Sequence, residues 1–262
     1  MTDWAAFAGI TAAVLVLLLL LARASQTVVS AGSDEPTGTA SAEPVETGEL
    51  RTVRYGPEPP EPREESYPTK LLLVNVAFSQ GVFAALLLAG AWLTAVPPSA
   101  FGLSGPLAPA VALGLGFGVA LSLANTGAGA LAEAFGHAPS EELRELLAPE
   151  SLGGWLLLLG VVLPVIAGFE ELLFRGALIG AMSVGFELSP WLLAVLSSVA
   201  FALGHGAQGP IGITVTGTLG FVLAVGYILT GSLVVVVVAH YLVNAVEFLV
   251  YEGLGVEVPF KS

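Results

Sequence analysis

Long apolar segments are the feature that most constrains what this chain can fold into. Several of them reach the ~20 residues that a helix needs to cross a hydrocarbon core about 30 Å thick. None shows the period-2 alternation of a barrel strand. Hydrophobic residues make up 55% of the 262 residues and charged residues only 11%, far fewer than in soluble domains. The sequence therefore predicts an all-α, multi-pass bundle of about seven or eight transmembrane helices in the cell membrane.

The charged residues lie mostly outside these segments. The formal net charge is −13, and the chain has only two lysines, Lys70 and Lys261. An acidic, lysine-poor exterior suggests a cell with high internal salt, where screening tolerates crowded carboxylates. The lack of a basic patch argues against nucleic acid as a partner. The lack of cysteine excludes disulfides, thiolate nucleophiles and thiolate metal ligands.

Composition divides the chain into four regions. The first apolar run, residues 4–22, lacks a basic n-region and is longer than a signal-peptide core. These properties favour an uncleaved anchor, although the sequence around residue 24 resembles a cleavage site. A stretch rich in Ser, Thr, Gly, Pro and Glu follows, and the basic residues flanking it favour the cytoplasmic side. The predicted regions are an N-terminal anchor (1–23), a disordered acidic linker (24–69), membrane helices preceding the core (70–149) and the core itself (150–255).

The membrane part of the chain should contain several further spans. Glycines at 114, 116 and 118 punctuate one of them and would let a neighbouring helix approach closely. Between residues 125 and 150 the chain leaves the membrane, with a short interfacial helix around Arg144 and a surface histidine at His137. The expected apolar segments are 71–96, 107–124, 152–166, 191–203, 211–229 and 233–250.

Three ionisable residues interrupt the apolar pattern near the end of the segment 152–166. Glu170 and Glu171 open a predicted helix that runs to about residue 184, and Arg175 follows one turn later. A charged group at bilayer depth is costly, so these residues mark a functional site by default. Glu171 and Arg175 are four positions apart and face each other, whereas Glu170 is turned about 100° away. We therefore expect Glu170 to project into the bundle as a base; the competing interpretation is a buried ionic knot that only holds helices together.

Two histidines on later segments offer further candidates. His205 follows Phe201 by four positions, so both are expected on one helix face. Glycines flank His205, which leaves its imidazole open to a ligand or a proton. His240 and Asn244 are also four positions apart, so both can donate hydrogen bonds to one developing oxyanion. The competing interpretations are a hydrogen-bonded core histidine for His205 and a polar clasp between helices for His240 and Asn244.

Other polar residues are given simpler roles. Asp3 and Asp34 are the only aspartates and lie outside the predicted membrane core, which excludes an intramembrane aspartate dyad. Near the end of the last segment, Glu247, Tyr251 and Glu252 are expected to be interfacial anchors.

The three polar segments, in this order, resemble the CPBP family of intramembrane proteases, which includes CAAX prenyl endopeptidases and bacteriocin self-immunity proteins. That family shows Glu-Glu-x-x-x-Arg, then Phe-x-x-x-His, then His-x-x-x-Asn or Asp. The resemblance covers about residues 150–252. The corresponding sequences here are Glu170-Glu171-Leu-Leu-Phe-Arg175, Phe201-Ala-Leu-Gly-His205 and His240-Tyr-Leu-Val-Asn244, with no departure.

This resemblance implies an endopeptidase that acts on a membrane-proximal or hydrophobic C-terminal peptide or protein. The first glutamate and the first histidine would activate water, the second histidine and the asparagine would stabilise the oxyanion, and the second glutamate with the arginine would support the site. The implied catalytic residues are Glu170, Glu171, Arg175, His205, His240 and Asn244.

The sequence leaves two questions open: whether the chain uses a metal ion, and whether it is a protease at all. Members of the family are often called metalloproteases, and Glu170, His205 and His240 could form a His₂Glu zinc site with an open water position. The chain has no His-Glu-x-x-His helix, and a metal-free glutamate mechanism agrees equally well with the sequence. A non-proteolytic immunity or scaffold protein, binding a peptide or a membrane partner, is the alternative function. A proton-coupled transporter is disfavoured because no internal repeat is present.

Overall fold

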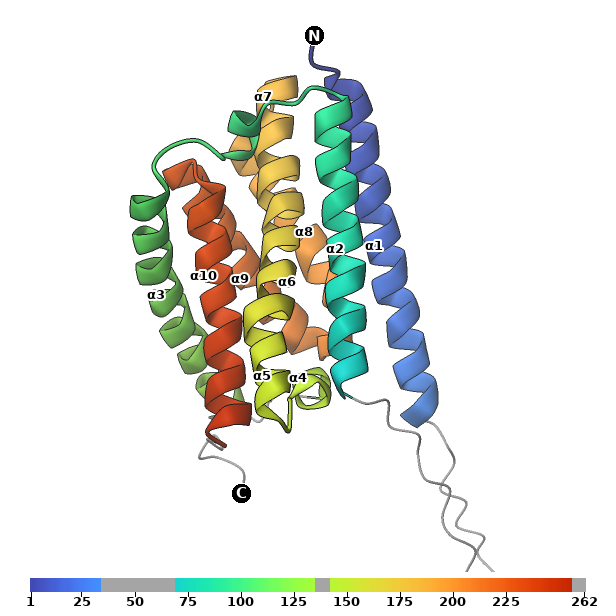
Figure 1. Ribbon diagram of the computed structural model, residues 1–262, viewed down its shortest axis with the longest axis vertical. Helices are drawn as coiled ribbons and strands as arrows, with labels where there is room; N and C mark the ends of the chain where they lie inside the picture. Colours follow the sequence, from blue (N-terminus) through green and yellow to red (C-terminus); the bar gives the residue numbers. More distant parts are fainter. Residues whose placement is uncertain (34–68, 135–141, 256–262) are drawn as a thin grey trace, which may run out of the picture.

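The computed structural model describes residues 1–33, 69–134 and 142–255, and over these ranges it is helical without any strand (Figure 1). Six of its helical segments are long and apolar enough to span a membrane, and α8 (Pro190–Gly204) is a shorter apolar helix beside them. This arrangement confirms the predicted all-α, multi-pass membrane bundle.

Glycine and proline set several of the helix boundaries. Gly231 adopts the left-handed conformation (φ 63°) that ends α9 and returns the chain into α10. Pro190 lies in the first turn of α8, where its missing N–H has no helical partner in any case. The elements outside the central helix are α1 (Trp4–Ser33), α2 (Thr69–Leu93), η1 (Pro98–Phe101), α3 (Leu107–Ala134), α4 (Glu142–Leu147), α8 (Pro190–Gly204), η4 (Gly206–Gln208), α9 (Gly209–Thr230), α10 (Leu233–Glu247) and η5 (Phe248–Gly253).

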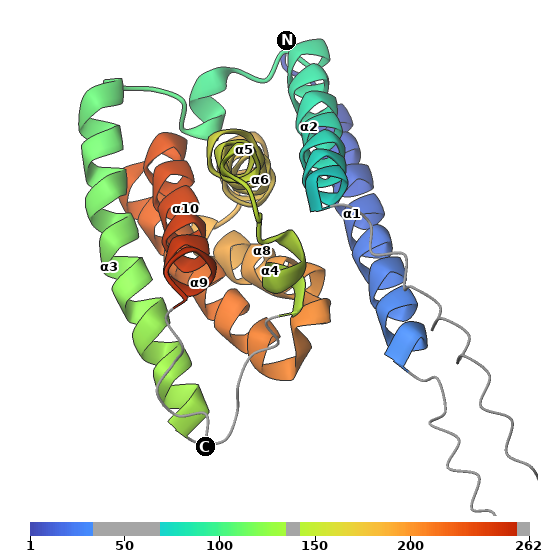
Figure 2. The same ribbon diagram turned by 60° about the horizontal axis from the view of Figure 1, so that its bottom comes forward.

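A continuous central rod crosses the middle of the bundle. It begins at Ser151, whose side chain accepts a hydrogen bond from the Gly154 N–H. Figure 2 shows this rod nearly end-on, with α10 on one side and α2 on the other, in agreement with the contacts of α6. Its parts are α5 (Leu152–Leu157), the π-helical η2 (Leu158–Val162), α6 (Leu163–Glu171), the π-helical η3 (Leu172–Ala181) and α7 (Met182–Phe186).

The rod corrects one expected boundary. We expected an apolar segment that ends near residue 166 and a helix opened by Glu170 and Glu171. That boundary is wrong, because the two carboxylates lie in the middle of a 35-residue apolar path. Pro164 does not interrupt the path because it occupies the first turn of α6, directly after a π-helical turn.

Other boundaries also differ from the expected ones. Helix α1 continues to Ser33, ten residues into the predicted linker 24–69; residues 34–68 lie outside the described residues, and Thr69 already opens α2. Helix α3 continues to Ala134 instead of ending near residue 124. The expected short helix around Arg144 is present as α4, while His137 lies outside the described residues.

Helix α3 approaches α10 closely through two of its spaced glycines. A Cβ atom at Gly114 would lie 2.8 Å from the Val235 carbonyl oxygen, and one at Gly118 would lie 3.0 Å from the Cα of Ala239. Any side chain at either position would therefore push the helices apart. The predicted role of these two glycines is confirmed, whereas Gly116 has no atom within 4 Å of its Cβ position.

At one end of the bundle, α4 is fastened to α10 and η5 by one arginine. Arg144 Nε donates to Glu252 Oε1 at 2.7 Å, and Arg144 Nη1 lies 3.6 Å from Glu247 Oε1. The guanidinium also stacks 4.5 Å from the centroid of the Tyr251 ring. The residues predicted as interfacial anchors thus surround one cation that the sequence analysis had not paired with them.

Candidate active site

The carboxylate and the arginine four positions apart form a fully buried ion pair in the central rod. Glu171 Oε1 lies 2.8 Å from Arg175 Nη1, and both side chains are 0% exposed. Arg175 Nη2 also donates to the Gly220 carbonyl oxygen of α9 at 2.6 Å, and its guanidinium lies 4.9 Å from the centroid of the Phe201 ring. The arginine therefore connects the central rod to both α8 and α9.

His240 of α10 binds the same carboxylate oxygen. Its Nδ1 lies 2.7 Å from Glu171 Oε1, and because an ionised carboxylate only accepts, the hydrogen is on Nδ1. This bond fixes the orientation of the imidazole and directs Nε2 to Glu170, whose Oε2 is 3.7 Å away. That distance is too long for a hydrogen bond and within the range of an ion pair. Glu170, with its side chain 11% exposed, thus faces the reactive edge of an oriented histidine.

Phe201 of α8 and His205, which follows the last residue of α8, lie against each other. His205 caps the C-terminal end of α8, and its Nδ1 lies 2.8 Å from the Phe201 carbonyl oxygen. Since a carbonyl oxygen only accepts, Nδ1 carries the hydrogen and the neutral ring presents an unprotonated Nε2. The Phe201 ring is 4.5 Å from the His205 ring and 6.1 Å from the His240 ring, between centroids. The expected common face of Phe201 and His205 is confirmed.

The structure therefore joins four of the six predicted site residues directly. Glu170, Glu171, Arg175 and His240 are connected by the contacts above. His205 reaches this cluster only through the Phe201 ring in the part of the chain that the structure describes. Asn244 is half-buried one turn after His240, and its side chain makes no hydrogen bond to any described residue.

Gly220 is a structural participant that the sequence analysis missed. A Cβ atom there would lie 2.8 Å from Phe201 Cδ1 and 3.4 Å from Arg175 Nη2. Only glycine lets the α9 backbone approach the guanidinium and the ring this closely. The sequence signal was weak, because Gly220 is one of several glycines in an apolar helix and its partner Arg175 is 45 positions away.

Ser197 of α8 is a second missed participant. Its Oγ donates to the Phe174 carbonyl oxygen at 2.6 Å, and its residue is 2% exposed. Phe174 lies in the π-helical η3, where the backbone is wider than in an α-helix. Since Arg175 is the next residue, this bond holds the backbone that carries the buried cation.

The described side chains do not form the predicted zinc ligand set. In the described ranges, no group of three or more histidine, aspartate or glutamate side chains is placed to hold a metal ion. His240 already gives Nδ1 to Glu171, and the Phe201 ring lies against both imidazoles. The residues as arranged do not fit a His₂Glu site with Glu170 and His205. Zinc dependence therefore stays a prediction.

Comparison with known families identifies the segment that carries these motifs. Residues 152–246 match the family described as type II CAAX prenyl endopeptidase Rce1-like. The match contains all three polar motifs and confirms the resemblance to CPBP-type proteases, while α1, α2 and α3 lie outside it. Neither the curated proteins nor the solved structures gave a match.

Proposed function

We propose that this chain is an intramembrane endopeptidase that hydrolyses membrane-proximal or hydrophobic C-terminal peptides with water activated by Glu170 and His205. A general CAAX-type protease function follows from the family match. The observation that carries the finer proposal is the chain of contacts from Arg175 through Glu171 to His240. It orients His240 with Nε2 toward Glu170, which forms no ion pair with an arginine in the described ranges.

Charge balance supports an electrophilic role for His240. Glu170 and Glu171 carry two negative charges against the single positive charge of Arg175. An imidazolium at His240 would make this buried cluster neutral. Because Nδ1–H is bonded to Glu171, only the imidazolium has a further N–H, at Nε2, to donate to an oxyanion. Asn244, one turn later on α10, would supply the second donor.

The proposed reaction consumes one water molecule for each peptide bond. The water oxygen forms a bond to the carbonyl carbon while its proton passes to Glu170, and the carbonyl oxygen becomes the oxyanion. The unprotonated Nε2 of His205 can orient the water as an acceptor. When the oxyanion collapses, the C–N bond breaks and the leaving nitrogen takes the proton from Glu170. The products are a carboxylic acid and an amine, and the acid then passes its proton to the amine, which leaves a carboxylate and an ammonium group.

Glu171 and Arg175 have a different role in this proposal. Both are 0% exposed, and Glu171 Oε1 is shared between the guanidinium and the His240 imidazole. A carboxylate held in this way is a poor proton acceptor and a good orienting group. We therefore place Glu171 and Arg175 as positioning residues, with the base on the neighbouring Glu170.

The test is cleavage of a library of hydrophobic C-terminal reporter peptides by the purified full chain in detergent and matching salt. Wild type is compared with Glu170→Ala and His205→Ala, each with and without a chelator. We expect cleavage by wild type and loss in both variants. Inhibition by chelator that is reversed by zinc would support the metal mechanism. Equal cleavage by Glu170→Ala overturns the assignment of the base, and no cleavage by any form favours a protein that binds without hydrolysis.

A further inference from the structure

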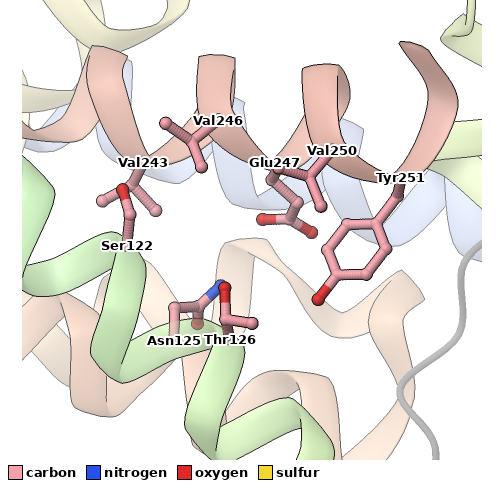
Figure 3. A pocket seen from close by; sticks show the side chains of 8 residues that line it. All are labelled: Ser122, Asn125, Thr126, Val243, Val246, Glu247, Val250 and Tyr251. Atoms are coloured by element: carbon pink, nitrogen blue, oxygen red, sulfur yellow. The ribbon is translucent and has the colours of Figure 1, made fainter. Parts of the chain in front are cut away.

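A second polar cluster lies on α10, about two turns from His240. A small open pocket between α3 and α10 contains Ser122, Asn125 and Thr126 from one side and Glu247 and Tyr251 from the other (Figure 3). Three valines complete its wall. In Figure 3 the Glu247 carboxylate and the Asn125 amide face the same space. Carboxylate, amide and hydroxyl groups that line one pocket can bind a polar ligand.

Arg144 holds the α10 side of this pocket in place. Its guanidinium lies 3.6 Å from Glu247 Oε1 and 4.5 Å from the Tyr251 ring centroid, and its side chain is only 14% exposed. The two pocket side chains are therefore positioned before any ligand arrives, which lowers the entropic cost of binding. The Glu247 side chain is still 37% exposed, so a ligand can reach it.

The charge of the pocket selects the kind of ligand. Arg144 contacts two carboxylates, Glu247 and Glu252, so these three side chains carry a net negative charge. The last carbonyl groups of the helical path formed by α10 and η5 add partial negative charge at the same end. Asn125 and Thr126 supply neutral oxygen acceptors beside them. A cationic group that can donate several hydrogen bonds fits this combination.

The pocket and two residues of the proposed active site, His240 and Asn244, share helix α10. Val243, which lines it, precedes Asn244 directly. Glu247 follows His240 by seven positions, which is about 10 Å along a helix axis, and an extended peptide covers that length with about three residues. We propose that the pocket is a substrate subsite for a lysine or arginine side chain about three residues from the scissile bond. This inference rests on the proposed peptidase function.

The first test scans one lysine along hydrophobic peptides, over five positions on each side of the scissile bond, with glutamine as the neutral match. For wild type in lipid nanodiscs, we expect kcat/KM to be about tenfold higher for lysine than for glutamine near the third position. Glu247→Gln should bring this ratio close to one, and Asn125→Asp should raise it. Glu187→Gln, which removes an exposed carboxylate at the end of α7, should leave the ratio as in wild type.

A second readout does not depend on cleavage. A carbodiimide joins a lysine amine and a carboxylate in direct contact into an amide and takes up the elements of water. With the Glu170→Gln protein and the lysine peptide, peptide mapping should locate the link at Glu247 and not at Glu187. If the link forms at Glu247 but wild type does not cleave the peptide, the lysine-binding subsite is supported and the peptidase proposal is overturned. Cleavage by wild type with equal rates at all scanned positions, and no link at Glu247, would overturn the subsite alone.

Discussion

Two arginines of this protein have similar partners and opposite environments. Arg175 pairs with Glu171 and stacks on Phe201, and both ionised side chains are 0% exposed. Arg144 pairs with glutamates and stacks on a tyrosine, but it is 14% exposed and its two carboxylate partners are 17% and 37% exposed. The chemistry of the contacts is nearly the same, so burial is the variable that differs.

Burial changes what an ion pair contributes to stability. A buried pair loses its hydration, and Glu171 Oε2 and Arg175 Nε have no hydrogen-bond partner in the described ranges. Such a pair gives little net stabilisation, yet removal of one partner leaves the other charge uncompensated. Near the surface, water and salt screen the interaction and replace a lost partner. The buried arginine is thus best explained by the histidine that it helps to orient, and the other by its attachment of α4 to α10.

The largest loss of stability is expected from Arg175→Met, which disrupts the buried ion pair. The substitution retains most of the volume and leaves Glu171 as an uncompensated buried charge. We expect a loss of about 3–5 kcal/mol in the free energy of unfolding. Thermal or denaturant unfolding in detergent measures it. A loss below about 1 kcal/mol would place Arg175 in the same class as a surface arginine.

A smaller loss is expected from Gly220→Ala, which tests the attachment of the buried cluster to α9. The new methyl group would meet Phe201 Cδ1 at 2.8 Å. Overpacking of this kind costs about 1–3 kcal/mol and should displace the ring that contacts both imidazoles. Gly160→Ala is the matched control, because no atom lies within 4 Å of its Cβ position. Equal stability and cleavage rates for the two variants would contradict the positioning role of Gly220.

Ser197→Ala removes the bond from α8 to the π-helical backbone beside Arg175. The Phe174 carbonyl would lose its side-chain donor in a buried place, which costs about 1 kcal/mol. Ser198→Ala is the control, since its hydroxyl bonds only within its own helix, to the Ala194 carbonyl oxygen. Unfolding measurements that rank Ser198→Ala as the more damaging variant would contradict this account of η3.

The smallest effect should follow from Arg144→Met. Its partners are partly exposed, so we expect a loss of no more than about 1 kcal/mol that shrinks as salt is added. Unfolding at low and high salt measures both properties. A salt-independent loss comparable with that of Arg175→Met would remove the distinction between the two clusters.

The sequence predicted the fold class and two relations within the site, because all of them depend on local pattern. Hydropathy over about 20 residues identifies the spans. The four-residue spacing of Glu171 and Arg175 identifies their ion pair, and that of Phe201 and His205 identifies their common helix face. Such information is contained within one helix, so no tertiary structure is needed to read it.

The remaining contacts depend on how separate helices pack. Glu171 and His240 are 69 positions apart, and Arg144 and Glu252 are 108 apart. Nothing in either local sequence selects its partner. The π-helical turn at η3 likewise has no clear sequence pattern, since its apolar residues would also form an ordinary α-helix. The boundary expected near residue 166 is wrong because two adjacent carboxylates interrupt the apolar pattern, and the partner of Glu171 on another helix, His240, is visible only in the packed structure.

We propose that two adjacent carboxylates in one buried cluster, Glu170 and Glu171, have different roles, and a paired measurement on Glu170→Gln and Glu171→Gln distinguishes these roles. Both kcat/KM for a cleaved reporter peptide and the unfolding temperature are determined for each variant. We predict that Glu170→Gln loses about 10²–10⁴ in rate with an unfolding temperature close to that of wild type. Glu171→Gln should unfold much more easily, because it removes the acceptor shared by Arg175 and His240. Retained cleavage in Glu170→Gln, or the same destabilisation in both variants, would contradict the account.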